Sequence, residues 1–102
     1  MQIDYPHSLT PDEVRARLEA LGDYLHNRHG IEVTWQGDRA AFKGRYLVVK
    51  FSGELSLGEG VVYFRGEDPG LLWRKRAMNY LMGKLEKYLN PSVPVDELPR
   101  GA

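Results

Sequence analysis

Apolar and polar residues alternate most clearly between positions 46 and 65, and this alternation predicts a long β-hairpin. Gly58 and Gly60 flank Glu59 and supply the positive φ angles that a tight hairpin turn requires. A register centred on this turn brings three pairs of residues together: Leu57 with Val62, Leu55 with Phe64, and Glu54 with Arg65. The apolar pairs share one face and the ion pair lies on the other, which indicates a sheet with one buried face.

Positions 11–29 have the period of an amphipathic helix, with a narrow apolar stripe on one side. Thr10 is a suitable cap, Pro11 suits the first helical position, and Glu13 has the spacing that completes a capping box. Gly30 is the stop signal. We therefore predict a first helix that lies on a sheet and buries only its apolar stripe.

Positions 69–89 predict a second helix, with Asp68 as its cap, Pro69 at its first position and Asn90-Pro91 at its end. Its apolar arc is wider and carries larger side chains, so we expect this helix to supply more of the core. The arc consists of Leu71, Ala77, Met78, Leu81, Met82, Leu85, Tyr88 and Leu89. Arg74 falls inside the arc, where either Glu67 or Asp68 neutralises it or a second subunit contacts it.

Shorter extended segments complete the sheet. Positions 2–5 predict an edge strand that ends at Pro6, and positions 31–35 and 39–42 predict two further strands. Positions 43–45 are expected to turn into the long strand of the hairpin. Gly53 interrupts the apolar alternation of that strand and is the expected place of a bend or bulge.

These elements predict an α+β fold in the order β-α-β-β-β-β-α. The antiparallel sheet has four to five strands and can curl around the C-terminal helix, and both helices pack on one face. Residues 1–90 form the single domain, and residues 91–102, which are rich in proline and lack periodicity, form a loosely ordered tail.

The composition narrows the function further. The 102 residues have no net charge and a pI near 6.8, so the molecule as a whole has no long-range attraction to nucleic acid or to anionic membranes. The absence of cysteine excludes disulfides, zinc thiolate sites and cysteine nucleophiles. We find no signal-peptide pattern and no window as long as a membrane span, so we expect a cytoplasmic protein.

Catalytic signals are weak. Asp23, His26 and His29 follow one another at i, i+3 spacing, which could bring them to one metal ion, but histidines in a last helical turn also suit the helix dipole. No nucleophile elbow or phosphate loop is found, and the acidic residues do not converge. We therefore expect a protein without enzyme activity, metal or cofactor.

The second helix has a basic side that also carries aromatic residues: Trp73, Arg76, Tyr80, Lys84 and Lys87. We place this side away from the apolar arc. Exposed aromatic rings among cations can stack on nucleic-acid bases, lie at an amphipathic surface or bind a protein partner. Alternatively, Trp73 folds over the rim of the sheet and the lysines are simply solvated.

The outer face of the hairpin is a second candidate surface. Tyr46, Val48, Val61 and Tyr63 fall on the side of the strands that the helices leave uncovered. Apolar side chains there indicate a partner surface, of which self-association into a homo-oligomer is the simplest form. The alternative is that scattered apolar residues are normal on sheet faces.

Several short motifs resemble a family of bacterial polyhydroxyalkanoic acid system proteins, named for genes near storage-granule loci. The resemblance is carried by the run Tyr5-Pro6-His7-Ser8-Leu9, by Trp35 with Gly37-Asp38 and Phe42, and by the last helix, which is rich in leucine and lysine. It covers about positions 3–89, of which 45–70 are more apolar and richer in tyrosine than is usual in the family. It implies an accessory protein that contacts the granule surface or granule proteins, and it assigns no catalytic residues.

The resulting hypothesis is a non-enzymatic accessory or binding protein of polyhydroxyalkanoate storage. The alternatives are a homo-oligomeric interaction module unrelated to granules and a weak nucleic-acid binder that uses the basic side of the last helix. A small-ligand pocket between the sheet and that helix also stays open.

Overall fold

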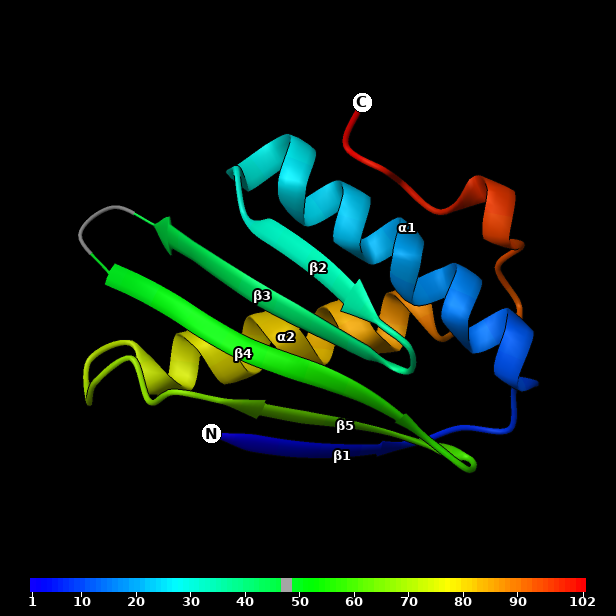
Figure 1. Cartoon of the computed structure of the whole chain (residues 1–102), viewed down its shortest axis with the longest axis horizontal. Coiled ribbons are helices and arrows are strands. Elements are labelled where there is room, and N and C mark those ends of the chain that lie inside the picture. Colours follow the sequence, from blue (N-terminus) through cyan, green and yellow to red (C-terminus); the bar gives the residue numbers. More distant parts are fainter. Residues whose placement is uncertain (47–48) are drawn as a thin grey trace.

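The computed structural model describes residues 1–46 and 49–102, except for the side chain of Tyr46. These residues form the predicted α+β fold, with two α-helices and an antiparallel sheet of five strands (Figure 1). The strands are β1 (Gln2–Pro6), β2 (Glu32–Gln36), β3 (Arg39–Tyr46), β4 (Val49–Gly58) and β5 (Val61–Gly66). The helices are α1 (Pro11–His29), α2 (Arg74–Tyr88) and the short 3₁₀ helix η1 (Val95–Glu97).

The sheet is open, with the strand order β1-β5-β4-β3-β2. The β4–β5 hairpin has the predicted register: Leu57 opposite Val62, Leu55 opposite Phe64, and Glu54 opposite Arg65. Gly60 adopts a φ of 69°, as the tight turn requires. Gly58 does not share that role. It lies in β4, where a Cβ atom would come within 2.7 Å of the Tyr63 ring.

β3 is longer than the sequence pattern predicted. It pairs with β4 from Arg39 opposite Ser56 to Tyr46 opposite Val49, so the turn predicted at positions 43–45 is wrong. Gly44, which indicated that turn, instead allows close packing, because a Cβ atom there would lie 2.9 Å from Cγ1 of Ile31. The connection between β3 and β4 falls at positions 47–48, outside the described residues.

Gly53 also serves close packing. The β3–β4 register runs through it without an extra residue on either strand, so the predicted bulge is wrong. Gly53 lies opposite Gly66 of β5, and a Cβ atom at either glycine would come within 2.6 Å of the Phe64 ring. The two glycines therefore make room for that ring.

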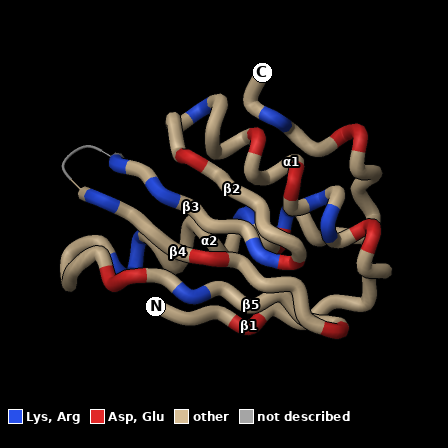
Figure 2. Tube along the Cα trace, in the orientation of Figure 1, with Lys and Arg blue, Asp and Glu red and all other residues tan. Residues whose placement is uncertain are grey.

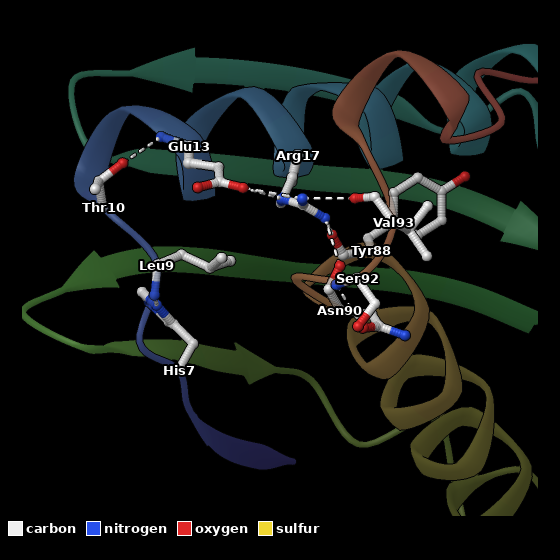
Figure 3. A network of polar contacts seen from close by, with 9 residues as sticks. All are labelled: His7, Leu9, Thr10, Glu13, Arg17, Tyr88, Asn90, Ser92 and Val93. Carbon is white, nitrogen blue, oxygen red and sulfur yellow. Dashed lines mark hydrogen bonds and ion pairs between the residues drawn. The ribbon is translucent and has the colours of Figure 1, made fainter.

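α1 begins and ends where the sequence predicted. Thr10 Oγ1 accepts a hydrogen bond from the Glu13 amide at 3.2 Å, and Gly30 is left-handed with a φ of 67°. The Glu13 carboxylate points to Arg17 instead of completing the predicted capping box, and it accepts from Nε at 3.2 Å and from Nη2 at 2.9 Å (Figure 3). A guanidinium is a stronger donor than a backbone amide, so it takes the carboxylate.

α2 begins at Arg74, later than predicted. Gly70 has a φ of 103°, outside the helical region, and its amide donates to the Asp68 carboxylate at 2.9 Å in a turn, so Asp68 does not cap the helix. Leu71 and Leu72 lie in the next turn, which the Trp73 amide closes by donating to the Gly70 carbonyl at 3.1 Å, and they are 82% and 87% exposed. The prediction that Leu71 belongs to a buried arc is therefore wrong.

The core lies between the helices and one face of the sheet. Side chains of both helices belong to a single buried cluster with Ile3, Leu55 and Phe64, as expected for helices packed on one face. α1 contributes more buried residues than α2, which contradicts the expectation from the sequence. The reason is that only the second half of α2, around Leu85 and Tyr88, packs fully into the core.

A buried arginine joins α1 to the end of α2 (Figure 3). Arg17 is 1% exposed. Its guanidinium donates to three carbonyl oxygens: those of Tyr88 at 3.2 Å, Asn90 at 2.8 Å and Val93 at 2.6 Å. Carbonyls at a helix C-terminus lack helical donors and carry partial negative charge, so they suit a cation. The carboxylate of Glu13 balances the buried charge.

The residues after α2 lie along α1. Leu98 is 4% exposed, the hydroxyl of Tyr88 donates to the Pro99 carbonyl, and Arg100 pairs with Asp23 at 2.6 Å. The division into a domain of residues 1–90 and a loosely ordered tail stays a prediction, which amide hydrogen exchange would measure.

Replacing Arg17 by methionine should lower the free energy of unfolding by about 3–5 kcal/mol, because three carbonyls and a carboxylate lose their donor. Urea unfolding measures the loss. The control is Arg39→Met, since the Arg39 side chain is 70% exposed in its pair with Glu54. That variant should lose less than about 1 kcal/mol. Equal losses would contradict the role assigned to Arg17.

Candidate functional site

A cavity of about 380 Å³ lies between the first half of α2 and the inner face of the sheet. Its floor consists of buried side chains from α1 and the strands: Leu21, Leu25, Leu55 and Phe64. The volume is within the range of about 300–1,000 Å³ that small-molecule sites occupy. The sequence left undecided whether a pocket lies between the sheet and the last helix, and the structure contains one.

The walls of the cavity are predominantly apolar. The wall on the side of the sheet includes Ile31, Phe42 and Phe51, and the opposite wall includes Trp73, Ala77 and Leu81. Ala77 is the smallest of these side chains and leaves space beside α2. Such walls favour hydrocarbon over sugar or nucleotide groups, which would lose hydrogen bonds to water on entering.

Exposed charged side chains border the cavity: Lys43, Arg45, Arg76, Glu67 and His29. The first two come from the end of β3, and Arg76 comes from the first turn of α2. Three cations against one carboxylate give the charged lining residues a net positive charge. The site thus combines an apolar interior with a basic rim.

An aromatic cluster continues from one side of the entrance to the space between α1 and α2. Nζ of Lys84 lies 4.1 Å from the centroid of the Tyr24 ring and 5.4 Å from that of Tyr80. Nε2 of His29 lies 3.1 Å from the Tyr80 hydroxyl. A hydrogen bond from Lys84, together with its charge, holds the pKa of Tyr24 below its ordinary value. Burial raises the pKa of Tyr80 to about 12.

The residues predicted as a candidate metal site have other partners. Asp23 pairs with Arg100 at 2.6 Å, and Nδ1 of His26 lies 3.1 Å from the Ile31 carbonyl oxygen. His29 belongs to the aromatic cluster. Within residues 1–46 and 49–102, no group of three or more histidine, aspartate or glutamate side chains is arranged to hold a metal ion.

His7 lies between β1 and α1. Its Nδ1 accepts a hydrogen bond from the Leu9 amide at 3.1 Å, which requires an unprotonated Nδ1. Burial lowers its pKa, in the same direction. The geometry therefore gives His7 a local role in fixing the chain before α1.

The match to a protein family covers most of the chain. The family model described as "putative polyhydroxyalkanoic acid system protein" matches residues 1–92. The chain belongs to this family. The match confirms the resemblance that the motifs of the sequence indicated. No curated protein and no solved structure matches the chain. In the described part of the chain, neither helix is both long and apolar enough to cross a membrane.

Three of the predicted surface residues of this polyhydroxyalkanoic acid system protein, Trp73, Arg76 and Tyr80, line the cavity. Their predicted position away from the apolar arc is therefore wrong. Trp73 precedes α2, so a helical wheel does not place it, and the side chains of Arg76 and Tyr80 are long enough to reach the cavity beside Ala77. Lys84 covers the Tyr24 ring, and Lys87 is exposed. Their use as an interaction surface stays a prediction.

The other predicted residues lie apart from the cavity. Tyr63 is 36% exposed on the outer face of β5. Val48 and the side chain of Tyr46 lie outside the described residues. Arg74 pairs with Asp68, one of the partners proposed for it from the sequence.

Sequence reasoning missed the contribution of the sheet to the basic rim, because Gly44 indicated a turn between Lys43 and Arg45. The signal that could have found these two cations is the alternation of positions 42–45. There Phe42 and Gly44 occupy one side of a strand and the cations the other.

Replacing Lys84 by methionine should raise the pKa of Tyr24 towards the ordinary tyrosine value of about 10, because the tyrosinate loses a donor and a cation. An NMR titration of the tyrosine rings measures this. The control is Lys87→Met, an exposed lysine of the same helix, which should leave the titration unchanged. An unshifted Tyr24 in the Lys84 variant would contradict the contact.

Proposed function

We propose that this polyhydroxyalkanoic acid system protein is a non-enzymatic accessory protein that binds the surface of polyhydroxyalkanoate granules in the bacterial cytoplasm. The family supports the link to polyhydroxyalkanoate. The observation that carries the mode of binding is the exposure of Leu71 and Leu72 in the turn before α2.

Leu71 and Leu72 are 82% and 87% exposed, although burying a leucine stabilises a protein by about 1.5–3 kcal/mol. Two adjacent leucines left in water support the existence of an apolar partner. Trp73 follows them directly, and tryptophan favours the boundary between water and an apolar phase. The surface of an aliphatic polyester offers such a boundary. We call Leu71 and Leu72 the apolar tip.

The end of the molecule that carries the apolar tip is also basic (Figure 2). Its six cations flank the β3–β4 connection or follow the leucines: Lys43, Arg45, Lys50, Arg74, Lys75 and Arg76. Positions 43–50 and 67–76 contain two carboxylates, those of Glu67 and Asp68, whereas the whole chain has no net charge. Cations beside exposed apolar side chains are typical of proteins held at an interface.

Replacing both leucines of the apolar tip by serine should reduce co-sedimentation with purified polyhydroxyalkanoate granules at least about tenfold, because two apolar side chains no longer leave water on binding. Binding of the native protein should persist at high salt, since hydrophobic contacts are not screened. Because both leucines are exposed, the thermal unfolding temperature should not change.

The control is Tyr63→Thr, which removes an exposed aromatic side chain from the outer sheet face and should leave granule binding intact. Loss of binding in this variant alone would assign binding to the hairpin face, and light scattering would then report whether that face joins two copies. A steep fall of binding with salt that disappears in Arg76→Glu with Lys84→Glu would indicate electrostatic binding of the nucleic-acid type. Failure of the native protein to co-sediment would overturn the proposal.

A further inference from the structure

We infer that the cavity between α2 and the sheet binds a single-chain aliphatic carboxylic acid. The hydrocarbon chain lies among the apolar walls, and the carboxylate lies at the basic rim. This inference goes beyond granule binding and does not depend on it, because the apolar tip and the cavity are formed by different side chains.

The size of the cavity indicates that it is a site and not a packing gap. The cavity opens to solvent at its entrance, and its volume of about 380 Å³ lies within the range of about 300–1,000 Å³ of small-molecule sites. It reaches down to the fully buried Leu21 and Leu55. Its apolar walls give water few hydrogen bonds, so an apolar ligand gains free energy by replacing that water.

The volume also limits the ligand. If a methylene group takes about the space of a water molecule in the liquid, about 30 Å³, the cavity of about 380 Å³ holds a chain of at most about thirteen carbons. Two acyl chains of a phospholipid would not fit. The small side chain of Ala77 on the wall formed by α2 is one reason that a chain can pass between the helix and the sheet.

The basic rim specifies the other end of the ligand. Lys43 and Arg45 of β3 and Arg76 of α2 are among the residues that line the cavity. In β3 the side chains of Lys43 and Arg45 alternate with that of Phe42, which forms the wall, so Arg76 is the cation that we assign to the carboxylate. A guanidinium binds a carboxylate through two parallel hydrogen bonds. Glu67 is the carboxylate among the described lining residues, and it opposes the binding of an anion.

The test is calorimetric titration of the protein with decanoate below its micellar concentration. Arg76→Gln should weaken binding at least about tenfold, since a charge-assisted contact is lost. The matched control is Lys75→Gln, the neighbouring cation, which does not line the cavity and should have little effect. Glu67→Gln should strengthen binding, because the opposing charge is removed. Equal effects of the Arg76 and Lys75 variants would overturn the inference.

Four probes separate the two ends of the ligand. Methyl decanoate lacks the charge and butyrate lacks the chain, so both should bind more weakly than decanoate. Equal binding of the methyl ester would overturn the role of the rim. 3-Hydroxydecanoate distinguishes the source of the acid: tighter binding than decanoate indicates a hydroxyalkanoate, and equal binding indicates fatty acids in general. No binding of any of these acids would overturn the inference.

Ala77→Phe should fill the cavity and abolish decanoate binding. Its control is Asn79→Phe, which adds the same ring at an exposed position of α2. Circular dichroism identifies a variant that fails to fold, and the Arg76 and Lys75 pair keeps the inference testable in that case. The serine variant of the apolar tip should retain decanoate binding, and Arg76→Gln should retain most granule binding, so failure of one proposal is distinguishable from failure of the other.

Discussion

The contact of the buried Arg17 guanidinium with the carbonyls that follow α2 is the constraint on which the rest of the arrangement depends. Such a cation is stable in an apolar interior only when its donors are satisfied and its charge is balanced, here by Glu13. It fixes the C-terminal end of α2 against α1, next to the buried Leu85 and Tyr88. The first half of the helix is then free to stand apart from the sheet, and the cavity occupies that space.

Glycines shape the opposite wall of the cavity. Gly53 and Gly66 accommodate the Phe64 ring, and Gly44 lies against Ile31. Because glycine has no side chain, the side chains of Phe64 and Ile31 can pack directly against the backbone of the sheet at these positions. The apolar cavity results from two features: α2 is fixed to α1 at its C-terminal end, and the sheet lacks side chains at these glycines. Cations of β3 and α2 are among its lining residues.

The elements with strong local signals could be predicted from the sequence: the β4–β5 register from its alternation, and α1 from Thr10 and Gly30. The errors arose where one residue type serves two physical purposes. Gly44 and Gly53 have the signature of a turn and a bulge, but neighbours that are distant in sequence require them. The sequence singled out the aromatic and basic residues of α2 but placed those that line the cavity on the wrong side of the helix. The helix begins later than predicted because the backbone of Gly70 is not helical.

The gathering of cations at one end of an otherwise neutral chain has a consequence for motion near an interface (Figure 2). Charges separated in this way give a neutral molecule an electric dipole, on which a uniform field exerts a torque but no net force. Close to an anionic surface, within a screening length of about 8 Å at physiological ionic strength, this torque acts before any contact forms. The torque therefore orients the molecule before contact, so that the end carrying Leu71 and Leu72 faces the surface.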